Sequence, residues 1–201
     1  MKATLTKKNL GVLVSGGGSN LQAVIDAAQN GEINGRIAVV ISSNPSAYGI
    51  TRAQNHNIPS AVAALADFDG NRPLRDARIV ETLRWYNVDY VILAGYLGVL
   101  TEPLLLAYKD RIINIHPSLL PKFGGVGLHG LNVHRAVLAA GEKTSGATVH
   151  FVEEGVDTGR IIAQESLDVL PSDTPESLQT RILDQIEHKL LVRVVGDLCN
   201  K

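Results

Sequence analysis

The sequence predicts an α/β fold built on a doubly wound, mostly parallel sheet of the Rossmann-like kind. Short apolar runs, typical of buried strands, alternate with segments of helical periodicity along most of the chain. The first run leads into a glycine loop, Ser15-Gly-Gly-Gly-Ser-Asn20, that opens a helix. Because no repeat, linker or low-complexity segment interrupts this alternation, we expect residues 1–201 to form one domain.

In the first half of the chain, strands and helices take turns. The expected elements are a strand over 10–15, a helix over 21–29, a strand over 36–42, a helix over 46–57, a strand over 58–62 and a helix over 73–86. Ser19 or Asn20 should cap the first helix and Ser46 the second, while Pro73 suits the first position of the third. The strand over 58–62 should lie at or near a sheet edge, because its proline lacks the N–H that a central strand needs.

The second half starts with the same alternation and ends differently. The expected elements are a strand over 89–94, a helix over 103–108, a strand over 112–115, a helix over 132–140, strands over 144–151 and 159–167, and a last helix from 175. Thr101 should cap the short helix, and Asp173 or Thr174 the last one. We expect the two late strands to pair antiparallel. The last helix carries one apolar stripe at helical spacing, formed by Leu178, Ile182, Ile186 and Leu190.

The composition is that of an ordinary folded protein. Hydrophobic residues make up 45% and charged residues 19%, and 19 basic residues nearly balance 20 acidic ones. No long basic run is present, so binding to nucleic acid or to a membrane surface has no electrostatic support. No apolar run approaches the ~18 residues of a membrane span, and none at the N-terminus has the pattern of a signal peptide. We therefore expect a cytoplasmic protein, and the single cysteine, Cys199, excludes an intramolecular disulfide.

The glycine loop suits a phosphate better than a dinucleotide. A loop at a helix N-terminus offers backbone N–H groups and the positive end of the helix dipole to an anion. The dinucleotide fingerprint would need a glycine where Leu21 stands and an acidic residue after the second strand, where Ser42-Ser43-Asn44 stands instead. No Lys-Ser/Thr pair follows the loop either, so a nucleotide P-loop is excluded. A single phosphate site remains, with a ligand-free tight turn as the alternative.

A second pattern lies where the strand over 112–115 ends. Asn114 and His116 are two residues apart, so in a strand both side chains share one face, with Ile113 and Ile115 on the other. Pro117 should end the strand, and ligands bind at the carboxyl ends of strands in open α/β sheets. The alternative is a strand-terminal histidine that hydrogen-bonds the backbone.

The third pattern is an acidic residue, Asp157, in the glycine-flanked stretch Gly155-Val-Asp-Thr-Gly159. From spacing alone, an ordinary turn aspartate is the favoured interpretation. The six histidines form no recognised metal-ligand spacing, and we expect no metal. His129 and His134 lie in or beside a glycine-rich loop and are weaker candidates for lining a site.

Together these stretches resemble the glycinamide ribonucleotide formyltransferases, within the wider folate-linked formyltransferases. The resemblance rests on Val14-Ser-Gly-Gly-Gly-Ser-Asn-Leu-Gln-Ala23, Leu93-Ala-Gly-Tyr96, Asn114-Ile-His-Pro-Ser-Leu-Leu-Pro-Lys122, Thr148-Val-His-Phe-Val152 and Gly155-Val-Asp-Thr-Gly159. They occur in the family's order and cover nearly the whole chain. The stretch that begins at Asn114 marks the wider group, and the glycine loop narrows it.

The resemblance implies an enzyme that transfers a formyl group from 10-formyltetrahydrofolate, its co-substrate, to the amine of glycinamide ribonucleotide. It implies no metal, no nucleic acid or membrane partner, and a monomer or homodimer. The implied catalytic group is Asn114, His116 and Asp157. The implied ribonucleotide contacts are Gly18, Ser19 and Asn20 at the phosphate, and Glu187. The implied folate contacts are Arg72, Leu97, Gly98, Val99, Leu100 and again Asn114.

This sequence departs from the family's pattern at three places. Gly98 stands where many relatives carry a long, often basic side chain, Arg160 replaces a proline, and the loop over 122–132 is longer than in the shortest relatives. Three other interpretations stay open: a methionyl-tRNA formyltransferase, a formyltetrahydrofolate hydrolase and a phosphate-binding module without catalysis. The first two would need an added C-terminal and N-terminal domain, respectively.

Overall fold

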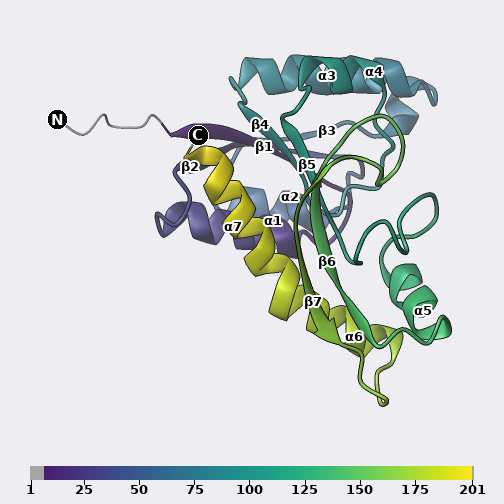
Figure 1. The fold of residues 1–201 in the computed structure, drawn as a ribbon. Helices are drawn as coiled ribbons and strands as arrows, with labels where there is room; N and C mark the ends of the chain where they lie inside the picture. The colour runs from purple at the N-terminus through teal and green to yellow at the C-terminus, as the bar shows by residue number, and fades with distance from the viewer. Residues whose placement is uncertain (1–6, 201) are drawn as a thin grey trace.

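A computed structural model describes residues 7–200, and in it seven strands form one mixed sheet with helices on both faces (Figure 1). The strand order is β3-β2-β1-β4-β5-β6-β7. The strands are β1 Lys8–Val14, β2 Gly35–Ser42, β3 Ser60–Val62, β4 Tyr90–Leu93, β5 Ile112–His116, β6 Thr144–Phe151 and β7 Ile161–Asp168. The predicted fold class is confirmed, and β3 lies at the sheet edge as its proline-bearing run predicts.

The sheet changes direction at β6. The ladders from β3 to β5 are parallel, whereas β5–β6 and β6–β7 are antiparallel. The antiparallel β6–β7 pair was expected from the sequence, but the pairing of β6 with β5 was not. Its register places His150 opposite Asn114 and Thr148 opposite His116.

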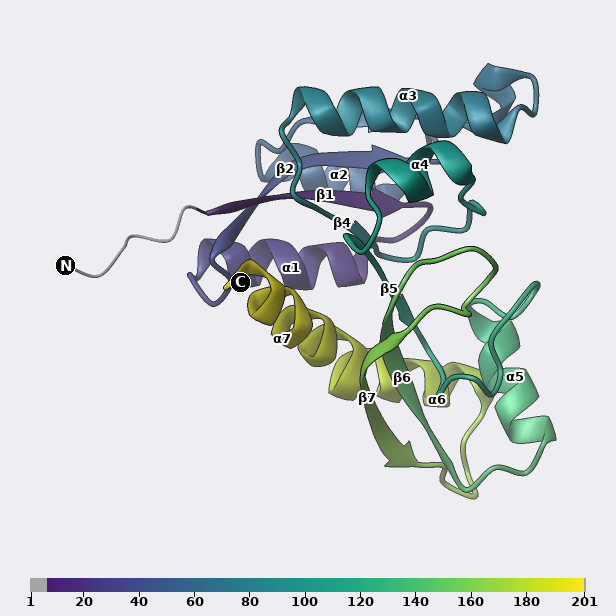
Figure 2. The same cartoon turned by 45° about the horizontal axis from the view of Figure 1, so that its top comes forward.

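The helices cover the two faces unequally (Figure 2). They are α1 Ser19–Gln29, α2 Tyr48–Asn55, a 3-10 turn Leu65–Phe68, α3 Arg72–Trp85, α4 Glu102–Ala107, α5 Leu131–Ala139, α6 Pro175–Ile182, a π turn Leu183–Glu187 and α7 His188–Cys199. Helices α3 and α4 pack on one face. Helices α1 and α7 lie on the other, and α5 and α6 extend that layer over the antiparallel strands. Among residues 7–200, no helix is long and apolar enough to cross a bilayer.

Two apolar clusters form the core, one on each face of the sheet. In β1, Val12 belongs to the cluster under α1 and α7, and Leu13 to the cluster under α3, as the two-residue period of a strand requires. Both side chains are fully buried. Burial of each such side chain stabilises the fold by roughly 1.5–3 kcal/mol. The faces of β5 follow the same rule, because Ile113 and Ile115 enter the α1/α7 cluster and leave Asn114 and His116 on the opposite side.

Three of the predicted side-chain caps are wrong. Thr101 occupies the N-cap position of α4, but its hydroxyl donates to Asp76 and does not cap the helix. Helix α1 begins at Ser19, two residues earlier than expected, so that Gly18, in a left-handed conformation, is its N-cap in place of Ser19 or Asn20. Helix α2 begins after Ala47 and has no side-chain cap, because the expected cap, Ser46, lies in a turn in which its N–H donates to the side-chain oxygen of Asn44.

The last helix differs from the prediction in another way. The Thr174 cap is confirmed, since its hydroxyl accepts from the N–H of Ser177 in a reciprocal capping box. The expected single helix is interrupted by the π turn Leu183–Glu187. A π turn holds one residue more than an α turn and so changes which side chains face inward beyond it. The apolar stripe nevertheless stays buried on both sides of the turn, at Leu178, Ile182, Ile186 and Leu190.

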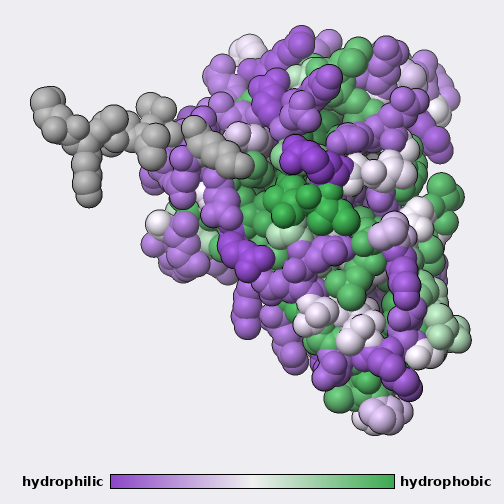
Figure 3. Space-filling view, viewed as in Figure 1, coloured by the Kyte–Doolittle hydropathy of each residue, from purple (hydrophilic) through white to green (hydrophobic). Residues whose placement is uncertain are grey.

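The topology locates the place for a ligand. The chain adds β2 and β3 on one side of β1 and then returns to add β4 on the other, so the strand order reverses between β1 and β4. Ligands of open α/β sheets bind beyond the carboxyl ends of the strands at such a reversal. On the face drawn in Figure 3, apolar side chains gather in the middle, between α3 above and α7 below, within a hydrophilic surround.

Candidate active site

A cavity of about 810 Å³ lies beyond the carboxyl ends of β1, β4 and β5. Its volume is in the upper part of the range of ~300–1,000 Å³ typical for small-molecule sites. Its walls are the glycine loop 15–20, the loop 93–100, the end of β5 over 114–117, the loop 125–130, residues 150, 152–153 and 155–157, and Gln179, Leu183 and Glu187 of the C-terminal helices. Segments distant in the sequence thus meet in one hollow.

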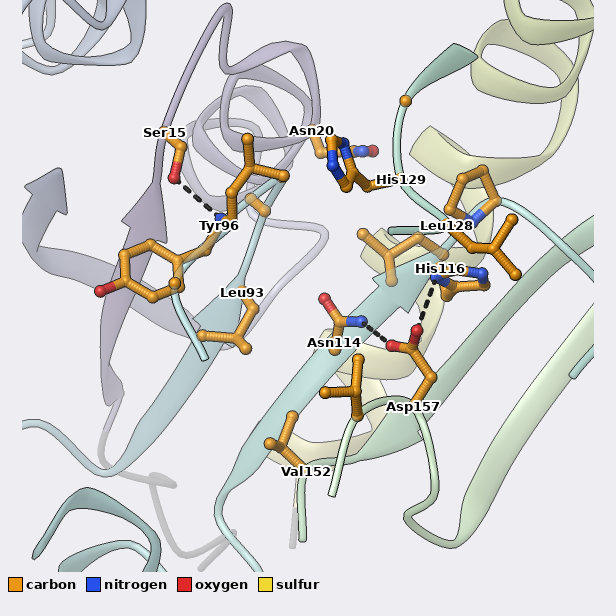
Figure 4. Close-up of a pocket in the computed structure, with 18 of the residues that line it drawn as sticks. Ser15, Asn20, Leu93, Tyr96, Asn114, His116, Leu128, His129, Val152 and Asp157 are labelled. Atoms are coloured by element: carbon orange, nitrogen blue, oxygen red, sulfur yellow. Dashed lines mark hydrogen bonds and ion pairs between the residues drawn. The ribbon is translucent and has the colours of Figure 1, made fainter. Parts of the chain in front are cut away.

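His116 stands between two acceptors at the end of β5. Its Nε2 is 2.8 Å from the carbonyl oxygen of Phe123, and its Nδ1 is 3.5 Å from Oδ2 of Asp157 (Figure 4). A carbonyl oxygen only accepts hydrogen bonds, so Nε2 must carry a proton. A second proton, on Nδ1, would face the carboxylate of Asp157 and form a charge pair in a buried place, since His116 is only 4% exposed.

Asp157 is held in a strained turn above β5. Its φ is 58°, in the left-handed region that non-glycine residues seldom adopt. The N–H of Gly125 donates to Oδ2 over 3.0 Å, and the Asn114 amide nitrogen is 3.5 Å from Oδ1. The carboxylate therefore faces Asn114, His116 and the glycine-rich loop together, and the structure brings together the three residues that the resemblance implies for catalysis.

A fourth side chain, His150, fixes the direction of the Asn114 amide. Its Nδ1 is 2.8 Å from the carbonyl oxygen of Phe151 and must carry a proton, while burial lowers the pKa of His150 and keeps the ring neutral near pH 7. Nε2 is then a bare acceptor, 3.1 Å from the amide nitrogen of Asn114. The Asn114 nitrogen rather than its oxygen must face His150, which leaves one of the two amide hydrogens for another partner.

The glycine loop is built for close backbone approach. Gly18 has φ 70°, and a Cβ there would lie 2.9 Å from Cα of Gly49 in α2. Arg52 donates from Nε to the carbonyl oxygen of Gly17 over 2.8 Å, which holds the loop against α2. Because α1 begins at Ser19, the N–H groups of its first turn have no partners within the helix and are suited to an anion.

Glu187 closes the cavity on the side of the C-terminal helices. The π turn ends at this residue, and its carboxylate accepts from the side-chain amide of Asn20 over 2.8 Å. Burial raises the pKa of Glu187 to about 7, against the smaller lowering effect of the Asn20 hydrogen bond. Asn20 is therefore tied by its side chain to Glu187, a link that the sequence did not predict.

The family of the chain follows from comparison with known proteins. A family model described as formyl transferase matches residues 8–195. The chain belongs to the formyl transferase family. Among the relatives of this chain are a phosphoribosylglycinamide formyltransferase, chloroplastic, of Arabidopsis thaliana and a phosphoribosylglycinamide formyltransferase of Haemophilus influenzae. The former is 44% identical over 195 residues, or 97% of this chain, and the latter 42% identical over 178 residues, or 89% of it.

The chain spans 66% of the length of the Arabidopsis protein and 81% of that of the Haemophilus protein. A solved structure, glycinamide ribonucleotide transformylase 1 from Symbiobacterium toebii, superposes with a TM-score of 0.93. It is 41% identical, and the match covers 100% of this chain and 91% of that one.

The structure places the other predicted site residues as follows. Leu97, Gly98, Val99 and Leu100 line the cavity, whereas Arg72 is the exposed first residue of α3 and does not line it. Of the weaker histidine candidates, His129 lines the cavity. His134 is fully buried in α5 with neither ring nitrogen hydrogen-bonded, and burial lowers its pKa to about 4.

Sequence reasoning missed His150 and the Asn20–Glu187 link. The alternation of β6 had placed His150 with Thr148 on one face, but only the pairing register shows that this face meets Asn114. Among residues 7–200, no cluster of three His, Cys, Asp or Glu side chains is arranged to hold a metal.

Proposed function

We propose that the chain transfers the formyl group of 10-formyltetrahydrofolate to the amine of glycinamide ribonucleotide. The observation that carries this proposal is the meeting of Asn114, His116 and Asp157 in one cavity whose other wall is the glycine loop. Proton-transfer groups and an anion site in one hollow suit a phosphorylated substrate that reacts some distance from its phosphate.

The ribonucleotide would occupy the side of the cavity that the glycine loop and Glu187 form. Backbone N–H groups of Gly18, Ser19 and Asn20 would hold its phosphate at the N-terminus of α1. The Glu187 carboxylate, already buried beside Asn20, would accept from a hydroxyl of the sugar. This arrangement needs no third loop glycine and no acidic residue after β2, which a dinucleotide would require.

The folate would lie against residues 97–100, on the β4 side of the cavity. Leu97 is 60% and Val99 42% exposed, so the loop offers apolar surface that a flat ring system could cover. The amide of Asn114 lines the same cavity, and the formyl group of the folate would sit beside it. Arg72 would meet an acidic part of the folate outside the cavity.

The reaction would begin with the amine. A free α-amino group has a pKa of about 7.7–8.0, so it must lose a proton before it attacks the formyl carbon. A new N–C bond then forms, and the carbonyl oxygen becomes an oxyanion. The Asn114 amide hydrogen that does not face His150 points to Oδ1 of Asp157 over 3.5 Å in the substrate-free site. It would turn from the carboxylate to donate to that oxygen, and such a donor can contribute about 3–4 kcal/mol to transition-state stabilisation. His116 would be the second donor.

Collapse of the intermediate would break the bond between carbon and the folate nitrogen. The leaving nitrogen takes a proton from the His116 imidazolium, and the amine's surplus proton passes to Asp157 directly or through water. The Nδ1 contact of His116 is its longer one at 3.5 Å, so this nitrogen is the one free to serve the reaction while Nε2 stays on Phe123. Asp157 favours the charged ring through its negative charge.

The decisive assay supplies 10-formyltetrahydrofolate with and without glycinamide ribonucleotide and follows the deformylated folate by absorbance. We expect turnover only when the ribonucleotide is present. Turnover that is independent of the ribonucleotide would select a formyltetrahydrofolate hydrolase. Binding of the ribonucleotide with no turnover under either condition would select a phosphate-binding module.

A further inference from the structure

The loop between β4 and α4 has no regular secondary structure, yet it is anchored at several points. The N–H of Ala94 donates to the carbonyl oxygen of Leu13, and the N–H of Leu97 donates to Oγ of Ser15 over 2.9 Å. These two anchors fix only the first half of the loop to β1. The second half, Val99 to Thr101, is held from the other side by helix α3.

Two neighbouring charged residues of α3 provide that hold. Arg75 is 2% exposed and Asp76 is 0% exposed, and Nε and Nη2 of Arg75 lie 2.8 and 2.6 Å from Oδ1 of Asp76. Arg75 also donates from Nη2 to the carbonyl oxygen of Val99 over 2.7 Å. Asp76 accepts from both the N–H and the hydroxyl of Thr101, over 2.6 and 2.7 Å.

Burial of the Arg75–Asp76 ion pair costs desolvation free energy, so packing stability alone does not explain why the pair is present. Removing two charges from water is expensive, and an apolar pair of similar volume often stabilises a core as well or better. Thr101, at the N-cap position of α4, likewise leaves that helix without a side-chain cap because its hydroxyl is used by Asp76. Both charges use their remaining hydrogen bonds on the loop rather than on the helix that carries them.

We propose that Arg75 and Asp76 form a positioning pair that fixes the loop Leu97–Thr101 in the shape that receives the formyl donor. The inference rests on the proposed function, which gives this loop to the folate. The pair holds the loop by the carbonyl oxygen of Val99 and by the N–H and hydroxyl of Thr101. The backbone N–H groups of Gly98, Val99 and Leu100 are not used in these hydrogen bonds and can donate to the ligand. The ring of Tyr96 packs between Arg75 and Gly98 and fills the space behind the loop.

The first test is Arg75→Lys. An ammonium group keeps the charge beside Asp76, but it lacks the planar fork that reaches both Asp76 and the Val99 carbonyl. We expect the KM for 10-formyltetrahydrofolate to rise roughly tenfold, because one charge-assisted hydrogen bond is lost. The kcat and the KM for the ribonucleotide should stay within about twofold of those of the parent. The matched control is Arg78→Lys, which alters an exposed pair with Glu81 on the same helix and should change neither KM.

The second test separates positioning from stability. The double variant Arg75→Met/Asp76→Leu removes both charges together, so its unfolding midpoint should lie close to that of the parent. The high folate KM should persist, because no anchor remains for Val99 or Thr101. Hydrogen exchange should quicken at the Thr101 amide and stay unchanged at Ala94, whose partner lies in β1.

The outcomes distinguish the two proposals. Turnover by the parent with an unaltered folate KM in Arg75→Lys and in the double variant would overturn the positioning role and leave the proposed function intact. Recovery of the KM together with stability in the double variant would make the pair purely structural. If the parent shows no ribonucleotide-dependent turnover, the proposed function fails, and with it the role of the pair in receiving folate.

Discussion

His116 ends strand β5 and Asp157 lies in the turn between β6 and β7, yet Nδ1 of the ring and Oδ2 of the carboxylate are 3.5 Å apart. β6 runs antiparallel to β5, so the chain leaves β6 beside the start of β5 and must fold back for Asp157 to reach the strand's end. The positive φ of Asp157 and the hydrogen bond from the N–H of Gly125 hold it there. A strained backbone held by a second loop is a feature often found at active sites.

Asp157→Asn should lower kcat by roughly 10²- to 10⁴-fold, the range of general acid–base catalysis. The substitution keeps the shape and removes the charge that favours the His116 imidazolium. The ribonucleotide Kd, measured by calorimetry, should change little, because Asp157 lies away from the glycine loop.

The ring signals of His116 in NMR provide the check on this reason. At a given pH near neutrality, the protonated fraction should be lower in Asp157→Asn than in the parent. An equal fraction in both proteins would make Asp157 a structural turn residue and reduce the catalytic group to Asn114 and His116.

His150→Leu tests the orientation of the Asn114 amide. Without the bare Nε2 as acceptor, the amide can rotate, and a donor to the oxyanion is no longer fixed in place. We expect kcat to fall about 10- to 100-fold, part of the value of one oxyanion donor, with both KM values nearly unchanged. His56→Leu, which alters the half-buried histidine at the C-cap of α2, serves as the control. A rise in the folate KM with normal kcat would contradict this role.

The raised pKa of Glu187 predicts that the free energy of unfolding depends on pH. Its pKa is raised from 4.5 to about 7 on folding, so between these values the folded chain binds more protons than the unfolded chain. Stability from this residue is therefore present below about pH 4.5 and is lost as pH rises through 7, by on the order of 3 kcal/mol. Glu187→Gln should remove this loss.

Urea unfolding of the parent and of Glu187→Gln at pH 5 and pH 8 measures the effect. The variant should gain stability relative to the parent at pH 8 and gain much less at pH 5. The difference between the two proteins is the relevant quantity, because the buried His134, with its lowered pKa, makes stability rise with pH below about 6.5 in both. Glu176→Gln, at an exposed position of α6, should show no such difference.

Arg72→Ala tests a contact that the structure leaves outside the cavity. We expect the KM for 10-formyltetrahydrofolate to rise several-fold with kcat little changed, as for the loss of a uniform binding contact. Steady-state kinetics with saturating ribonucleotide measures both constants. A large loss of kcat at saturating folate, or no effect at all, would remove Arg72 from the folate site.

Much of the fold could be predicted because local signals agree with it. Apolar runs mark all seven strands, Pro59 marks β3 as an edge strand, and Thr174 with Ser177 caps α6. The side chains that should cap α1, α2 and α4 do not do so, because several polar residues stand near each start and tertiary contacts decide among them. Thr101 is the clearest case, since a buried carboxylate from another helix takes its hydroxyl.

The site was predictable where neighbouring residues carry it and obscure where the sheet assembles it. The two-residue spacing of Asn114 and His116 identifies one face of one strand. The contribution of His150 depends on the register of an antiparallel pair, and that of Glu187 on a π turn, neither of which has a local signal that we could read. Asp157 is identified only by the family resemblance, because its turn alone looks ordinary.

The central claim is that this cavity passes a formyl group from folate to an amine rather than to water. Incubation with 10-formyltetrahydrofolate labelled with carbon-13 in its formyl group, followed by NMR of the products, tests it directly. We expect the label to appear in the amide of formylglycinamide ribonucleotide. Omission of the ribonucleotide, or the Asp157→Asn substitution, should abolish or greatly slow the release of the label from folate. Label recovered as free formate, at a rate independent of the ribonucleotide, would contradict it.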